Sequence, residues 1–91
     1  MTEKEIQLLG FERNDEEDLY DNNYRYYSYT VAMGLQFISN SSDEIKDGDE
    51  WYIDFFNSDP TIRFTEFGEV QALINLLEKR IIKSDTKEFK V

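Results

Sequence analysis

The sequence predicts one α+β domain of two layers. A roughly four-stranded antiparallel sheet, arranged as a meander, carries a C-terminal amphipathic helix on one face, and a short helix precedes the sheet. Three observations favour this class. The chain has 91 residues, which is room for a single small acidic domain over residues 1–91. Tyr- and Phe-rich segments separated by turn residues fill its middle. An apolar repeat at three- and four-residue spacing follows them.

The N-terminal element is predicted as a helix over about residues 3–9. Thr2 and Glu5 have the spacing of a capping box, and Gly10 follows the apolar residues of the helix as a stop signal. A helix this short is unstable alone in water, so we expect it to pack on the rest of the domain.

The segment between this helix and the sheet is predicted as an acidic loop over residues 14–23, because it consists almost entirely of turn formers and acids. Strands follow, and Met33-Gly34 is a plausible tight turn between the first two of them. Composition and alternation place the four strands at residues 24–33, 35–39, 51–57 and 61–64.

The C-terminal helix is predicted over residues 67–82. Its apolar face consists of Phe67, Val70, Leu73, Ile74, Leu77 and Ile81. Thr65 is the candidate N-cap. Gly68 costs up to about 1 kcal/mol relative to Ala, which favours a start one or two residues later. Residues 84–91 are predicted as a frayed tail.

The side-chain period of two sorts each strand into two faces. The more apolar set is expected under the helix as the core: Tyr27, Tyr29, Val31, Leu35, Phe37, Trp51, Ile53, Phe55, Ile62 and Phe64. The other face also carries aromatic residues, beside Thr30, Gln36 and Asp54. The candidate partner-binding residues on this second face are Tyr24, Tyr26, Ile38, Tyr52, Phe56 and Arg63.

Three interpretations of the second face stay open. Tyrosines on a solvated sheet face can pair across strands and stabilise it by up to about 1 kcal/mol each. The N-terminal helix can cover part of the face with Ile6 and Leu9. Alternatively, an aromatic cluster with an Arg has the composition of an interface centre.

Composition excludes several kinds of chemistry. The formal net charge is −10, from 20 Asp and Glu against 10 Lys and Arg, and the chain contains no His and no Cys. This excludes disulfides, a thiolate nucleophile, a Cys/His zinc site and a histidine acid–base catalyst. Binding along a nucleic-acid backbone needs clustered Lys and Arg, which the acidic balance opposes. We expect no catalytic residues, no cofactor and no resident metal.

The acidity belongs to the first 50 residues, where 13 acids and 4 bases give a net charge of −9. It concentrates at residues 15–21 and 43–50. Adjacent carboxylates in loops do not define a glycosidase pair, and the second stretch lacks the spacing of a calcium loop. A solvated acidic surface is the plain interpretation.

The sequence thus predicts a small non-enzymatic module that binds a protein partner or forms a homodimer. The alternative is an acidic mimic of nucleic acid that inhibits a basic DNA- or RNA-handling protein through electrostatic steering. The N-terminus lacks the basic start and apolar core of a signal peptide, and no apolar run reaches membrane-spanning length. We therefore expect a cytoplasmic protein that does not enter a membrane.

Overall fold

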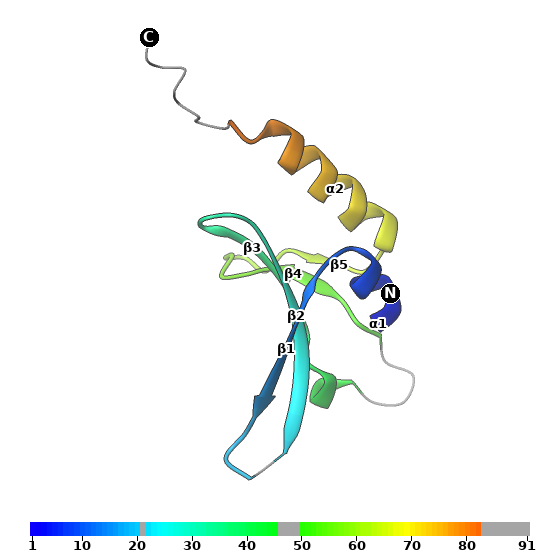
Figure 1. Cartoon of the computed structure of the whole chain (residues 1–91), viewed down its shortest axis with the longest axis vertical. Coiled ribbons are helices and arrows are strands. Elements are labelled where there is room, and N and C mark those ends of the chain that lie inside the picture. The colour runs from blue at the N-terminus through cyan, green and yellow to red at the C-terminus, as the bar shows by residue number, and fades with distance from the viewer. Residues whose placement is uncertain (21, 46–49, 83–91) are drawn as a thin grey trace.

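The computed structural model describes residues 1–20, 22–45 and 50–82. In this part of the chain, a five-stranded antiparallel sheet has the order β1-β2-β3-β4-β5, with one α-helix before it and one after it (Figure 1). Each strand pairs with the next strand in sequence, so the sheet is a meander and the predicted α+β class is confirmed. The tail predicted over residues 84–91 lies outside the described residues.

The N-terminal helix α1 spans Glu3–Leu8 and has the predicted capping box. The Glu5 amide donates to the Thr2 hydroxyl at 3.1 Å, and the Thr2 amide donates to the Glu5 carboxylate at 2.9 Å. Gly10 has a φ of +92°, a left-handed conformation that glycine adopts without a steric cost. Local sequence signals therefore define both ends of this helix.

Strand β1 spans Glu12–Glu17 and corrects the prediction of a loop from residue 14 onward. It pairs with β2 (Asn23–Ala32) in a continuous register from Glu12 opposite Ser28 to Glu17 opposite Asn23. The strand lies at the edge of the sheet, and its side chains are exposed except for half-buried Asn14. Its sequence therefore needs no apolar alternation, and backbone pairing with β2 holds it in place.

The other three strands occur in the predicted order, but the last two are shorter than predicted. They are β3 (Leu35–Ser39), β4 (Ile53–Phe55) and β5 (Arg63–Phe64). The residues before β4 were predicted as strand, but their amides bond elsewhere: Trp51 donates to the Met1 carbonyl, and Tyr52 donates to the Asn40 side chain. The turn at Met33-Gly34 is confirmed, with a φ of +86° at Gly34.

The C-terminal helix α2 spans Phe67–Arg80, so the predicted helix is present but ends two residues before the predicted range 67–82 does. Ile81, predicted on its apolar face, is the C-cap residue and has an extended backbone. The helix begins at Phe67, one residue later than a Thr65 N-cap would give, in line with the expected delay of its start. The predicted N-cap Thr65 is wrong: Glu66 occupies the cap position, and its side chain makes no capping hydrogen bond. Burial of Val70 and Ile74 against the sheet supplies the stabilisation that the missing cap does not.

The core lies between the sheet and both helices. Its fully buried side chains come from α1, the three central strands and α2: Ile6, Tyr27, Phe37, Ile53 and Val70. Most of the predicted core residues are buried or packed against this cluster. Leu35 and Ile62 are the exceptions. Leu35, beside the β2–β3 turn, is half-buried but is not among the residues packed against the cluster, and 45% of the surface of Ile62 is exposed because the chain there has not yet entered β5.

Since Ile6 joins the same cluster as Val70, α1 and α2 lie on the same face of the sheet. The interpretation in which the N-terminal helix covers the second face is therefore wrong. The β1–β2 hairpin extends away from the helices (Figure 1). No helix in the described residues is long and apolar enough to cross a bilayer.

Candidate functional site

The sheet face opposite the helices, called here the open face, carries a hollow of about 370 Å³. The alternation of side chains along three strands places the hollow on this face. The lining residues Tyr26, Ile38 and Asp54 each stand next in sequence to a residue that is buried in the core. These buried neighbours are Tyr27, Phe37 and Ile53. We call it the tyrosine hollow, and its lining consists of Tyr24, Tyr26, Ile38, Ser39, Asn40, Ser41, Glu44, Tyr52 and Asp54.

Four of the six residues predicted for a partner surface therefore lie together: Tyr24, Tyr26, Ile38 and Tyr52. The strand register explains this grouping. Ile38 stands opposite Ser28 on one side and opposite Asp54 on the other. Directly opposed residues point to the same side of an antiparallel sheet, so β2, β3 and β4 supply adjacent parts of one surface.

Arg63, the fifth predicted residue, lies beside the hollow without lining it. Its register partner is Asp54, and the two side chains form a fork, with Nε 2.9 Å and Nη2 3.2 Å from the two carboxylate oxygens. The guanidinium also lies 3.8 Å from the centre of the Tyr52 ring. The hydrogen bonds with Asp54 raise the pKa of Arg63, and the charge of Glu44 adds to this effect.

Phe56, the sixth predicted residue, belongs to a different depression. It is 52% exposed and lies with Thr30 and Gln36 toward the β2–β3 turn. Phe56 and Tyr52 are four residues apart in a segment that is close to extended, which separates them by roughly 13 Å along the strand direction. Alternation assigned both residues to one face but carried no information on their distance.

Buried polar side chains hold the wall of the tyrosine hollow in place. The Ser39 hydroxyl accepts from the Tyr27 amide at 2.8 Å and donates to the Asn40 carbonyl at 2.7 Å. Asn40 donates to the Glu50 carbonyl at 3.3 Å and accepts from the Tyr52 amide at 3.0 Å. Asn40 thereby fixes the backbone that carries Tyr52.

The 3-10 turn η1 (Ser42–Glu44) contributes Glu44 to the lining of the hollow. The Ser42 hydroxyl accepts from the Arg25 amide at 2.9 Å, which ties the turn to β2. Sequence reasoning missed the four lining residues Ser39, Asn40, Ser41 and Glu44. Their polar composition is typical of a loop, and the contacts that draw them into the wall come from β2 and from residues 50–52.

The lining keeps hydrogen-bonding groups that no other described residue engages. They are the hydroxyls of Tyr24, Tyr26 and Tyr52 and the carboxylate of Glu44. The lining thus offers aromatic rings, hydroxyl groups and carboxylates. These groups are suited to noncovalent binding.

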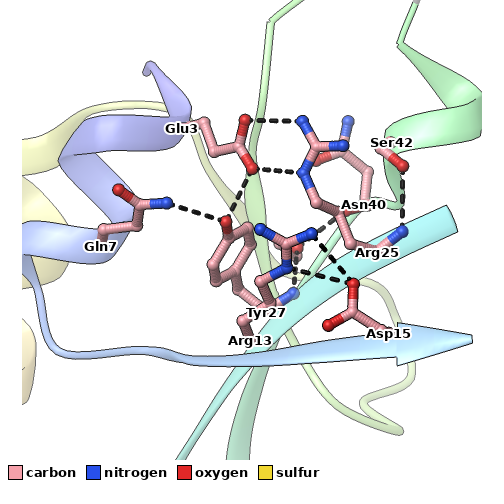
Figure 2. Close-up of polar contacts among 9 residues, drawn as sticks. Glu3, Gln7, Arg13, Asp15, Arg25, Tyr27, Asn40 and Ser42 are labelled. Carbon is pink, nitrogen blue, oxygen red and sulfur yellow. Dashed lines mark hydrogen bonds and ion pairs between the residues drawn. The ribbon is translucent and has the colours of Figure 1, made fainter.

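A polar cluster on the helix side links α1 to β2 (Figure 2). The Arg25 guanidinium donates two hydrogen bonds to the Glu3 carboxylate, with Nε 2.5 Å and Nη2 2.8 Å from its two oxygens. The Tyr27 hydroxyl donates to the same carboxylate at 2.6 Å. Gln7 donates to the Tyr27 hydroxyl at 3.0 Å. The hydrogen bonds from Arg25 lower the pKa of Glu3 to about 2.

The Arg25 guanidinium also lies 5.8 Å from the centre of the Trp51 ring, so it packs within the helix-side layer. Arg25 is therefore not part of the open face. The cluster fastens the N-terminal helix against the sheet directly behind the hollow, which makes it a structural element.

The acidic side chains are divided between the two faces of the hairpin. Glu12 stands opposite Ser28 and Glu16 opposite Tyr24, which places both on the open-face side. Asp15 and Glu17 point to the other side. Of the acids weighed for a calcium site, Asp47 and Asp49 lie outside the described residues. Within residues 1–20, 22–45 and 50–82, no three acidic side chains converge to hold a metal ion.

Comparisons with known proteins add no family to this picture: no protein-family model, no curated protein and no solved structure matches the chain.

Proposed function

We propose that this protein is a small non-enzymatic module that binds another protein, or a second copy of itself, through the open face. The observation that carries the proposal is the tyrosine hollow. Three half-buried tyrosines and Ile38 surround it on a sheet face that neither helix covers. Tyrosine is enriched where interfaces have their energetic centre, because its ring buries a large area while its hydroxyl keeps a polar partner.

The rigidity of the hollow supports the same proposal. Its walls are strands and a turn, and the side chains of Ser39 and Asn40 are buried and fully engaged in hydrogen bonds. A surface that is already ordered loses little conformational entropy when a partner binds. The hollow therefore suits recognition without a folding step.

The test compares two variants of the hollow with one matched control. Tyr26→Ser and Tyr52→Ser remove rings from the hollow, whereas Tyr20→Ser removes an 81% exposed ring from the tip of the β1–β2 hairpin. Light scattering after size exclusion measures self-association. Capture from the native cell identifies partners, and affinity is then measured with each purified partner.

The two hollow variants are expected to weaken association at least about tenfold, the change that 1.4 kcal/mol produces, and the control is expected to leave it unchanged. Circular dichroism establishes that each variant is folded. A protein that is monomeric at high concentration, and whose purified partners bind all three variants equally, contradicts the proposal.

A second candidate function is imitation of a nucleic-acid backbone, and one observation favours it. Glu12 and Glu16 of β1 share the open-face side with Glu44 of η1, so acids from both acidic stretches flank one surface. Such a surface would bind the basic groove of a DNA- or RNA-handling protein with strong salt dependence. Affinity for that protein that stays constant from low to high salt contradicts this mechanism.

A further inference from the structure

The lining of the tyrosine hollow indicates which chemical group it takes. We infer that the hollow receives the cationic head of an arginine or lysine side chain supplied by a partner protein. This inference rests on the proposed function, because it specifies what the open face recognises.

Three aromatic rings supply the first part of the argument. Tyr24 and Tyr26 of β2 and Tyr52 of the segment before β4 surround the hollow. The face of an aromatic ring carries partial negative charge and attracts a guanidinium or ammonium group placed over it. Ile38 adds an apolar wall against which the methylene stem of a long basic side chain packs.

Two carboxylates supply the second part. Glu44 and Asp54 line the hollow, and none of the lining residues is cationic. An anionic ligand would be repelled by these groups and by the net charge of −10. A neutral apolar ligand would take the Glu44 carboxylate out of water without compensation. A cation satisfies both the rings and this carboxylate.

Arg63 shows that this wall accommodates a guanidinium. It lies over the Tyr52 ring at 3.8 Å while it forks onto Asp54 at 2.9 and 3.2 Å. Because Asp54 is engaged in this way, Glu44 is the lining carboxylate without a hydrogen-bond partner among the described residues. Glu44 is therefore the group that an incoming cation meets.

The size of the hollow sets the extent of the ligand. About 370 Å³ is near the lower end of the range of small-ligand sites, roughly 300–1,000 Å³. This space suits one side chain with its stem and excludes a folded element of the partner. The rest of the partner must therefore lie on the surrounding open face.

The experiment titrates the isotope-labelled full chain with three short capped peptides and follows amide chemical shifts. The peptides are identical except for a central Arg, Lys or citrulline, the last being a neutral copy of Arg. The Arg and Lys peptides are expected to bind with millimolar dissociation constants and to shift the signals of the hollow, with citrulline at least tenfold weaker. Comparison of Arg with Lys identifies which cation the site prefers.

Two variants complete the test. Glu44→Gln is expected to weaken the Arg peptide about five- to tenfold, whereas Glu69→Gln, which makes the same charge change on exposed α2 surface, is expected to have no effect. Equal binding of citrulline and Arg, equal effects of the two variants, or shifts confined to other surfaces overturn the inference.

The failures of the two proposals are distinguishable. If no cationic peptide binds while Tyr52→Ser still abolishes partner association, this inference is wrong and the proposed function stands. If the peptides bind in the hollow while association with purified partners is unaffected by Tyr26→Ser and Tyr52→Ser, the proposed function is wrong and the cation site stands.

Discussion

The ion pair between Glu3 and Arg25 makes the stability of the fold depend on acid pH, and one substitution isolates this dependence. Glu3→Gln keeps the shape of the side chain and an oxygen that accepts from Arg25 and Tyr27, but it removes the charge. The folded state holds the pKa of Glu3 at about 2, below its ordinary value of 4.5. The charged pair therefore stabilises the fold above about pH 4.5, and its contribution is lost as the pH falls through 2.

The magnitude follows from the same pKa. A lowering from 4.5 to about 2 corresponds to at most about 3 kcal/mol in the free energy of unfolding. The side chains of Arg25 and Glu3 are 35% and 26% exposed, so solvent screens the pair. We therefore expect Glu3→Gln to cost about 1–2 kcal/mol at pH 7. In a domain of this size, each kcal/mol lowers the melting temperature by about 4–8 °C.

The assay is urea unfolding of the wild type and the variant from pH 7 to pH 3. The gap between them is expected to shrink by roughly half or more at pH 3, as Glu3 of the wild type becomes protonated in the unfolded state. Asp15→Asn is the matched control, because Asp15 pairs with Arg13 at 3.0 Å with both side chains more than half exposed. Its cost is expected to stay below about 0.5 kcal/mol at every pH. A Glu3→Gln cost that equals the control, or that does not change with pH, refutes the reasoning.

Four further substitutions test other parts of the structure. Thr2→Ala removes one half of the capping box and is expected to lower the free energy of unfolding by about 1 kcal/mol in thermal melts; no change would mean that the cap is not formed in solution. Phe37→Ala leaves a cavity at the centre of the core and is expected to cost about 3–5 kcal/mol in urea, whereas a cost under 1 kcal/mol contradicts the assigned core. Asn40→Ala leaves the Glu50 carbonyl and the Tyr52 amide without their hydrogen-bond partner, which is expected to lower the free energy of unfolding by about 1–3 kcal/mol. It is also expected to weaken binding of the Arg peptide, because Asn40 no longer holds the backbone of Tyr52. Tyr29 donates a hydrogen bond to Glu78 that raises the pKa of Tyr29. Stability from this bond is complete below the ordinary pKa of about 10 and falls at higher pH, so Tyr29→Phe is expected to unfold less steeply than the wild type in strong alkali.

Local signals account for the elements that sequence analysis predicted well. The capping box at Thr2 and Glu5 forms within one helical turn, and the apolar repeat from Phe67 onward needs only a surface to pack against. Alternation in β2 and β3 identifies which side chains enter the core. Each of these signals operates over a few residues, so the sequence carries it directly.

Strand β1 lacks such a local signal, so the sequence analysis missed most of it. Its residues Glu12–Glu17 contain no apolar side chain, and an edge strand with two exposed faces requires none. Pairing with β2 stabilises it, and this pairing depends on the neighbouring strand and the hairpin that joins them. A method that reads hydrophobic periodicity has nothing to detect in this segment.

The candidate site was predictable only in part, because local patterns identify a sheet face but not which residues on it lie together. Alternation identified the open face but not the position of each residue along its strand, so it grouped Phe56 with Tyr52. Ser39 and Asn40 enter the wall through contacts with residues 12 positions away in sequence. Those contacts arise only when β2, β3 and the segment before β4 come together.

The charges of β1 also govern what happens when two molecules meet edge to edge. The outer edge of β1 has no strand partner among the described residues, and unpaired strand edges are templates for aggregation. Strand β1 carries four carboxylates, on Glu12, Asp15, Glu16 and Glu17, against the single cation of Arg13. Charge repulsion between two such edges therefore opposes their pairing and makes β1 a poor template for association between copies of the chain.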